Sequence, residues 1–227
     1  MSTSLTLAYS TPRPSRLALA AVLANCLCLT GCNIAAWVGQ AFRADEAPVA
    51  VKANYRGLEN KRVAVLVSAD EYTLFRFPRS PAALGTAMSN RIQSNVAGVS
   101  VALPGEVEAF RRQNPYWVSS RPSRLLDQLG VDRLVVVELN DYRTNEQGNA
   151  NVWRGVIDAV VGVYEADAEV PDDRTFEQQV RAEFPENSRF GVLSHHAERH
   201  EIETAVLERF TLYAAGQFFD HERPPSR

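Results

Sequence analysis

Polar and apolar residues alternate with a period of two along two neighbouring segments in the second half of the chain. In residues 153–163, one face carries Trp153, Gly155, Ile157, Ala159, Val161 and Val163, and the other carries Arg154 and Asp158. In residues 175–184, Phe176, Val180, Ala182 and Phe184 share one face, opposite Thr175, Glu177, Gln179, Arg181 and Glu183. Such alternation is typical of strands with one buried face and one face in water. Because residues 170–173 suit a turn, the pattern predicts a β-hairpin whose outer strand is a sheet edge.

Other apolar patterns predict further strands and four helices. Continuous apolar runs at 62–68 and 134–137 indicate buried strands, and 99–103 indicates a short third strand. A period of three to four indicates helices over 80–96, 104–113, 122–129 and 194–219. Ser80 and Ser194 are the expected N-caps of the first and last helix, and Gly98 and Gly130 are expected to end two of them.

This order of elements predicts the fold class. The sequence β-α-β-α-α-β-β-β-α favours an α/β (α+β-like) fold, in which helices pack on a mixed β-sheet. The first two strands are expected to be parallel, because a helix connects them. Residues 61–220 would then form a single globular domain.

The first 32 residues predict export and lipid attachment. Arg13 and Arg16 precede an apolar run of residues 17–29, which is too short to span a bilayer and ends in Leu-Thr-Gly-Cys32. We therefore expect 1–31 to be a lipoprotein signal peptide, Cys32 to carry a covalent lipid, 32–60 to act as a tether and 221–227 to be a flexible tail. The alternatives are an ordinary cleaved signal or a short buried helix. Asn33, rather than an aspartate, follows the cysteine. Resemblance to the lipoproteins of bacteria with two membranes therefore implies attachment to the outer membrane rather than the inner one.

Composition and charge narrow the classes of partner. All three cysteines lie at or before Cys32, so the exported domain has neither a disulfide nor a thiol nucleophile. The net charge of the whole chain is −3, and the signal peptide contains no acidic residue. The remaining acidic domain argues against nucleic acid as a ligand. No cofactor is expected apart from the covalent lipid.

Two stretches resemble a group of bacterial envelope lipoproteins. They are Arg62-Val-Ala-Val-Leu and, after the 80–96 helix, Leu125-Leu-Asp-Gln-Leu-Gly-Val-Asp-Arg-Leu-Val-Val-Val-Glu138. The pattern is similar to the penicillin-binding-protein activators, the curli-secretion lipoprotein and the N-terminal domain of the Tol-system periplasmic protein. The resemblance covers roughly residues 60–220 and implies a binding protein without catalytic residues. It supports a fold better than a function.

Three clusters could carry chemistry. On a helix from 194, His196, His200 and Glu203 would share one face and could bind zinc, although a polar helix start without a function explains them better. Asp70 and Glu71 follow the first buried strand, where a cation could bind, and Glu138 and Asp141 could join them. Arg111 and Arg112 near Tyr116 and Trp117 could bind a glycan or an anionic polymer, or could simply end a helix.

These observations favour a non-enzymatic, membrane-anchored periplasmic protein that acts as an accessory domain in envelope assembly, transport or wall synthesis. The expected partner is another envelope protein, contacted through Gln179, Arg181 and Glu183. Addition of a strand at the hairpin edge is one route to that contact. The alternatives are a metal-binding protein or hydrolase that uses the 195–203 cluster, and a subunit of an oligomeric envelope assembly.

Overall fold

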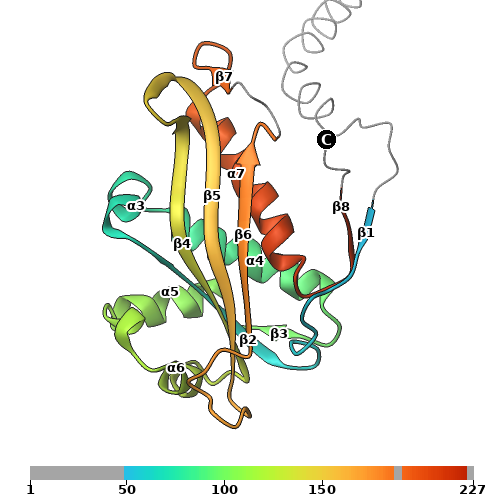
Figure 1. Ribbon diagram of the computed structural model, residues 1–227. Helices are drawn as coiled ribbons and strands as arrows, with labels where there is room; N and C mark the ends of the chain where they lie inside the picture. The colour runs from blue at the N-terminus through green and yellow to red at the C-terminus, as the bar shows by residue number, and fades with distance from the viewer. Residues whose placement is uncertain (1–48, 187–190, 224–227) are drawn as a thin grey trace, which may run out of the picture. The chain divides into compact units, whose positions relative to one another are not determined.

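Six strands form one mixed sheet in the computed structural model, which describes residues 49–186 and 191–223 (Figure 1). The strand order is β3-β2-β4-β5-β6, and β7 pairs with β5. β2 is parallel to both β3 and β4, whereas β4, β5 and β6 follow one another antiparallel. The strands are β2 (Arg62–Ala69), β3 (Ser100–Val101), β4 (Arg133–Glu146), β5 (Asn149–Glu165), β6 (Phe176–Phe184) and β7 (Val192–Leu193).

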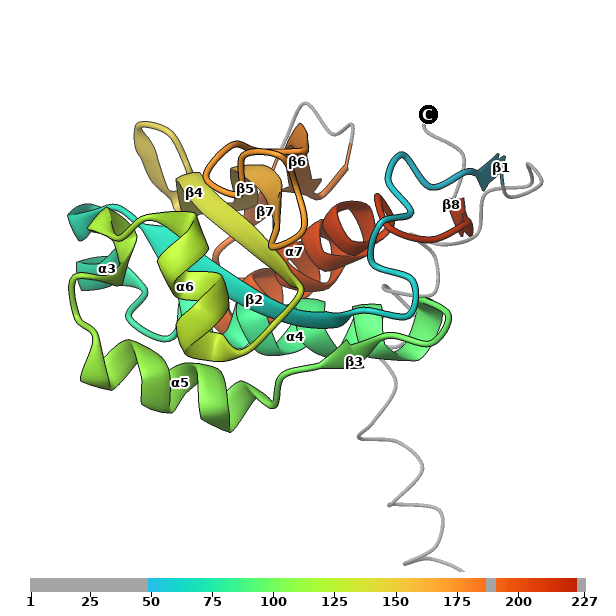
Figure 2. The same cartoon turned by 90° about the horizontal axis from the view of Figure 1, so that it is seen from below.

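Helices cover both faces of the sheet, but to different extents. One face packs against α4 (Ser80–Asn95) and α7 (Arg199–Ala215). The other packs against α5 (Pro104–Gln113) and α6 (Pro122–Leu129), which lie beside β2 and β4 (Figure 2). The short helix α3 (Glu71–Arg76) follows β2, and a 3-10 turn covers Trp117–Ser119. The predicted mixed sheet packed by helices is therefore confirmed.

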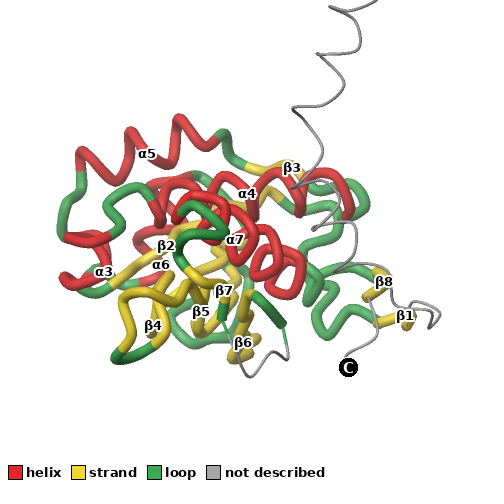
Figure 3. The backbone as a smooth tube through the Cα atoms, turned by 90° about the horizontal axis from the view of Figure 1, so that it is seen from above, coloured by secondary structure: helices red, strands yellow, loops and turns green. Residues whose placement is uncertain are grey.

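The alternation of side chains along the strands divides the core into two layers. Val65, Val135 and Ile157 point toward α4 and α7, whereas Leu66 and Val136 point toward α5 and α6. The second layer covers β2, the first half of β4 and Tyr164 at the end of β5. The rest of that face, on the outer part of β4 and on β5 and β6, is called the open face. Figure 3 shows α4 and α7 together on one side of these strands, and that side is the opposite face of the sheet.

The ends of the inner helices follow their local chemistry. α6 ends at Gly130, which has a φ of 60° and takes the left-handed conformation that glycine adopts without a steric penalty. α4 starts one residue earlier than expected. Arg79 is its N-cap, and Ser80 is the first helical residue, with its Oγ donating to the Phe77 carbonyl at 2.8 Å.

The last helix begins later than its sequence pattern suggested. Ser194 was expected to be its N-cap, but α7 starts at Arg199 after Glu198. The backbone N–H of Glu198 donates to Glu201 Oε2 at 3.0 Å, as in a capping box. The expectation for Ser194 is wrong because Val192 and Leu193 pair with β5, and the Ser194 N–H bonds to the Asn151 carbonyl.

The two ends of the described chain pair with each other. β1 (Val49–Val51) and β8 (His221–Arg223) form an antiparallel pair, and the Ala53 N–H donates to Asp220 Oδ1 at 2.8 Å. Leu58 is fully buried in the core. The expected tether is therefore wrong for residues 49–60, and the expected tail is wrong for 221–223. Cys32, the rest of residues 1–48 and residues 224–227 lie outside the described residues. Within the described part, no helix has the length and apolar character needed to cross a bilayer.

Candidate interaction surface on the open sheet face

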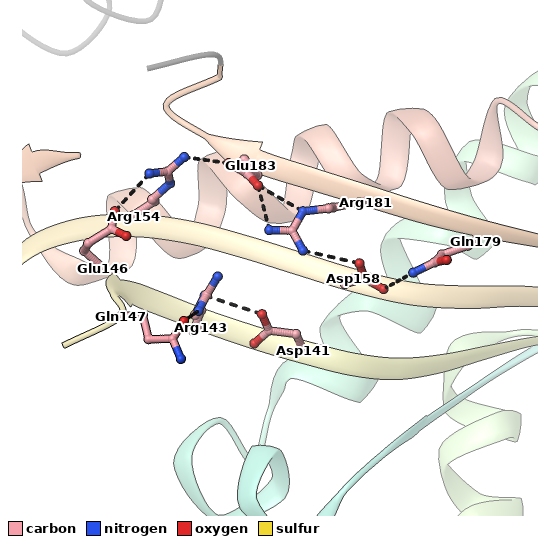
Figure 4. Close-up of polar contacts among 9 residues, drawn as sticks. All are labelled: Asp141, Arg143, Glu146, Gln147, Arg154, Asp158, Gln179, Arg181 and Glu183. Carbon is pink, nitrogen blue, oxygen red and sulfur yellow. Dashed lines mark hydrogen bonds and ion pairs between the residues drawn. The ribbon is translucent and has the colours of Figure 1, made fainter. Parts of the chain in front are cut away.

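A row of charged and amide side chains lies on the open face, where strands β4, β5 and β6 run side by side (Figure 4). We call this set the open-face network. Its members are Asp141, Arg143, Glu146, Arg154, Asp158, Gln179, Arg181 and Glu183. It contains all three residues that the sequence analysis named as a partner surface. The register of the strands brings them together, because Glu183 lies opposite Val156, and Arg181 lies opposite Asp158.

Arg154 connects two strands. Its Nη1 lies 3.0 Å from Glu146 Oε2 at the end of β4, and its Nη2 lies 2.9 Å from Glu183 Oε2 on β6. The Arg154 side chain is 23% exposed, so these contacts are partly shielded from water. Ion pairs in such positions are worth more than fully exposed ones. Arg154 therefore ties β4 to β6 across β5.

Arg181 extends the network along β6 and onto β5. Its Nη2 lies 2.7 Å from Glu183 Oε1, and its Nη1 lies 3.4 Å from Asp158 Oδ2. Gln179 Nε2 donates to Asp158 Oδ1 at 3.0 Å. Asp158 is buried, with 8% of its surface exposed. Both of its carboxylate oxygens nevertheless have hydrogen-bond partners, as buried polar groups normally do.

Two further groups adjoin this network. On β4, Arg143 Nε lies 3.4 Å from Asp141 Oδ2. Before β6, Arg174 contacts Glu138 and Glu177 and donates from Nε to the Tyr164 hydroxyl at 2.8 Å. Gly162 leaves room for this side chain, because a Cβ there would lie 3.1 Å from Arg174 Cδ. The open face thus carries more carboxylates (Glu138, Asp141, Glu146, Asp158, Glu177 and Glu183) than guanidiniums (Arg143, Arg154, Arg174 and Arg181), which makes it net acidic.

Hydrogen bonds within the open-face network favour the ionised forms of Glu183, Arg154 and Arg181. Partial burial alone would raise the pKa of Glu183, but hydrogen bonds from Arg181 and Arg154 outweigh it and hold the pKa below its usual value. Hydrogen bonds to Glu183 and Glu146 raise the pKa of Arg154, and the bond to Glu183 raises that of Arg181. A carboxylate held in this way is a poor proton donor at neutral pH. The arrangement therefore suits recognition by fixed charges better than acid–base chemistry.

The structure separates the histidine candidates. Because α7 begins at Arg199, His200 and Glu203 lie on the helix, but His196 lies in the turn before it. The expected common helical face of all three residues is therefore wrong. His200 Nδ1 lies 3.2 Å from Glu198 Oε2, and the His195 and His196 rings contact each other. Over residues 49–186 and 191–223, no group of three histidine, aspartate or glutamate side chains is arranged to hold a metal ion.

The acidic candidates form no common metal site among the described residues. The Asp70 carboxylate caps α3 by accepting from the Thr73 N–H at 2.7 Å, and these hydrogen bonds lower its pKa. Glu138 and Asp141 belong instead to the arginine contacts of the open face. A cation site that joins them to Asp70 and Glu71 does not form.

The basic and aromatic candidates do not form one surface either. Arg111 Nη1 lies 2.6 Å from Glu108 Oε1 on its own helix, so its charge is paired. Trp117 is buried in the layer under α5 and α6, whereas Tyr116 is 84% exposed. The continuous basic and aromatic patch that the sequence suggested does not form, because the Trp117 ring is buried in the core.

The sequence pattern predicted some residues of the open-face network and not the others. The alternation pattern placed Arg154 and Asp158 on the wet face of their strand, and the structure agrees. Arg143 and Glu146 were missed because the apolar run of β4 stops at Val137 while the strand continues to Glu146. The signal was the polar hairpin turn at Gln147 and Gly148, where Gly148 has a φ of 80°.

Comparisons with known proteins give distant likenesses only. No protein-family model matches the chain, and neither does any curated protein. Similar solved structures include a PelC dodecamer from Paraburkholderia phytofirmans, with a TM-score of 0.41 and 8% identity over 75% of this chain and 98% of that one. A lipoprotein from Neisseria meningitidis has a TM-score of 0.38 and 13% identity over 56% and 85%. A hypothetical protein from Chlamydia trachomatis has a TM-score of 0.39 and 14% identity over 69% and 96%. Likenesses this distant carry no argument about function. Membership of the envelope lipoprotein groups that the sequence resembles therefore stays a prediction.

Proposed function

We propose that this chain is a lipid-anchored protein of the bacterial envelope that binds another envelope protein through its open sheet face and catalyses no reaction. The anchor is Cys32, and the sequence before it supports export and lipidation. The outer membrane is the proposed location, with the domain in the periplasm.

The open-face network is the observation that carries this proposal. A sheet face without a helix over it is normally polar, and a polar face alone needs no partner. Here, however, the polar groups are held in fixed positions by contacts among three strands, as with the two oxygens of Glu183. Fixed charges pay little conformational entropy on binding, which favours a specific partner.

The net negative charge of the open face predicts the charge of the surface that binds it. The complementary surface would be net basic, because opposite potentials across an interface steer association and exclude wrong partners. The open-face charges lie together on β4, β5 and β6, and most of them are partly exposed.

Crosslinking in intact cells followed by mass spectrometry tests the anchored partner model. The native chain is compared with Cys32→Ala, which removes the lipid site, and with Asp141→Asn/Glu146→Gln, which removes two open-face carboxylates away from the β6 edge. We expect one heteromeric adduct in the native sample, and its loss in both variants. An adduct that persists in both variants, or the absence of any heteromeric adduct, contradicts the proposal.

A further inference from the structure

The outer edge of β6 is a regular strand edge without a neighbour among the described residues. The strand order ends at β6, which Figure 1 shows in orange at the border of the sheet. Its pairing with β5 runs from Phe176 to Phe184 without a register shift. At the opposite border the sheet ends in β3, which has only two residues, and the part of β4 beyond the end of β2 has register shifts at Leu139/Asp141 and Arg143/Asn145. Irregularities of this kind protect an edge from pairing, and β6 has none.

Side-chain donors occupy part of this edge. Gln178 Nε2 donates to the Gln179 carbonyl at 3.0 Å, and Arg209 Nη1 donates to the Glu183 carbonyl at 3.3 Å. The two backbone groups of one strand residue point to the same side, and the sides alternate along an antiparallel pair. The carbonyls of Gln179 and Glu183 therefore show that odd-numbered residues of β6 present their backbone groups outward.

We propose that β6 pairs antiparallel with β6 of a second copy of this chain, about a two-fold axis beside Gln179. In that register Glu177 lies opposite Arg181 of the second copy, twice by symmetry, and Gln179 lies opposite itself. Opposite charges directly across a strand pair stabilise it, and like charges destabilise it. Both side chains have partners within the chain, Arg174 for Glu177 and Glu183 for Arg181. At 57% and 47% exposure, each can share a further contact across the axis. This dimer goes beyond the proposed function and does not depend on it, because it needs neither the lipid nor another protein.

The other symmetric registers are worse. An axis at Glu177, Arg181 or Glu183 opposes a charge to its own copy, and an axis at Val180 opposes Glu177 to Glu183. An axis at Gln178 opposes Glu177 only to Gln179 and gains no ion pair.

An axis at residue 182 would pair Arg181 with Glu183 but has two faults. It needs the Glu183 carbonyl, which Arg209 occupies, and it extends the pairing to Pro185, which has no N–H to donate. The axis beside Gln179 uses only residues 177–181. It leaves the Arg209 bond in place, and only the Gln178 side chain has to give way to a backbone donor.

The pairing has a natural limit and a structural consequence. The Thr175 N–H donates inward to the Val163 carbonyl at 3.0 Å, so the outward run of β6 starts at Glu177. Each of the three opposed pairs in 177–181 exchanges two backbone hydrogen bonds. The two sheets join, and their open faces form one continuous polar surface across the axis.

A single cysteine tests the register. Gln179→Cys introduces the only cysteine after residue 32, and directly opposed residues lie about 5 Å apart at Cβ, within reach of a disulfide after a small adjustment. Full-length chains are expressed in cells, treated with a mild oxidant and separated without reductant. We expect Gln179→Cys to shift to twice the monomer mass, and Gln128→Cys, an exposed glutamine on α6, to stay monomeric. No shift for Gln179→Cys, or an equal shift for both, overturns the dimer.

Charge reversal provides the second test. In the Gln179→Cys background, Glu177→Arg alone and Arg181→Glu alone each place like charges opposite one another and should reduce the disulfide-linked fraction. The two reversals together restore opposite charges and should recover it. Failure of the double variant to recover, with an unchanged melting temperature of the reduced protein, overturns this register.

Discussion

Arg154 Nη2 lies 2.9 Å from Glu183 Oε2, and this contact joins the first part of β5 to the end of β6 on a face that no described helix covers. Glu183 also forms an ion pair with Arg181, so one carboxylate contacts two guanidinium groups. The open face is therefore organised around Glu183.

Removing the Glu183 charge should destabilise the fold more than removing a neighbouring one. Glu183→Gln leaves two arginines without their shared anion, and partly shielded bonds to charged groups are worth about 1.5–3 kcal/mol. We expect a loss of about 2 kcal/mol in the free energy of unfolding, measured by urea titration. Glu177→Gln is the matched control, because that side chain is 57% exposed and should cost less than about 0.5 kcal/mol. Equal losses would contradict the central position of Glu183.

Arg133 should be the most costly arginine to replace. Its side chain is 6% exposed, its Nη2 lies 3.0 Å from Glu165 Oε2, and its Nε donates to the Gly57 carbonyl at 3.0 Å. Loss of one member of a buried pair costs about 3–5 kcal/mol, because the other charge stays buried. Arg133→Met should lower the free energy of unfolding by about 3 kcal/mol. Arg56→Met, at an arginine that is 55% exposed, should cost much less, and the reverse ranking would refute this assignment.

Asp167 should contribute to stability in acid. Hydrogen bonds from Arg133 and Lys61 lower its pKa to about 2. A carboxyl whose pKa is lower in the folded state stabilises the fold above its unfolded pKa of about 3.9, and this contribution disappears as the pH falls through about 2. Urea midpoints of the native chain should therefore fall more steeply between about pH 4 and pH 2 than those of Asp167→Asn. The difference should be small, because Asp167 is 56% exposed; parallel curves would contradict it.

Gly155 should tolerate alanine better when Val206 becomes smaller. A Cβ on Gly155 would lie 2.8 Å from Val206 Cβ on α7, an atom that moves only with the helix backbone. Gly155→Ala should cost about 1–3 kcal/mol through overpacking. Val206→Ala should cost about 1 kcal/mol or more alone. It removes the Cγ1 contact at 3.0 Å but keeps the Cβ contact, so the double variant should recover only part of the loss relative to the sum of both single losses. Simple additivity in thermal unfolding would show that the contact is not limiting.

The sequence predicted those elements whose cause is local. The buried runs of β2 and β4, the alternation of β5 and β6, and the end of α6 at Gly130 depend on period and turn chemistry within each segment. These signals need no knowledge of the partner strand.

What the sequence could not predict depends on contacts between distant segments. β1 exists because Val49–Val51 meets His221–Arg223. The first segment is apolar but only three residues long, and the second is polar, so neither predicts a strand by itself. β4 continues through polar residues because β5 supplies its hydrogen bonds as far as Glu146. The anchoring role of Glu183 likewise requires the β5–β6 register, which places Arg154 and Arg181 on either side of it.

Site-specific capture on the open face tests the account most directly. A photo-reactive residue replaces Arg143, which lies on β4 away from the β6 edge, in the full-length chain in intact cells, and Gln128 on α6 provides the matched control position. The account predicts a heteromeric adduct at position 143 that is absent at position 128 and lost in Cys32→Ala. Equal capture at both positions, or self-adducts alone at position 143, would contradict the open face as the partner surface.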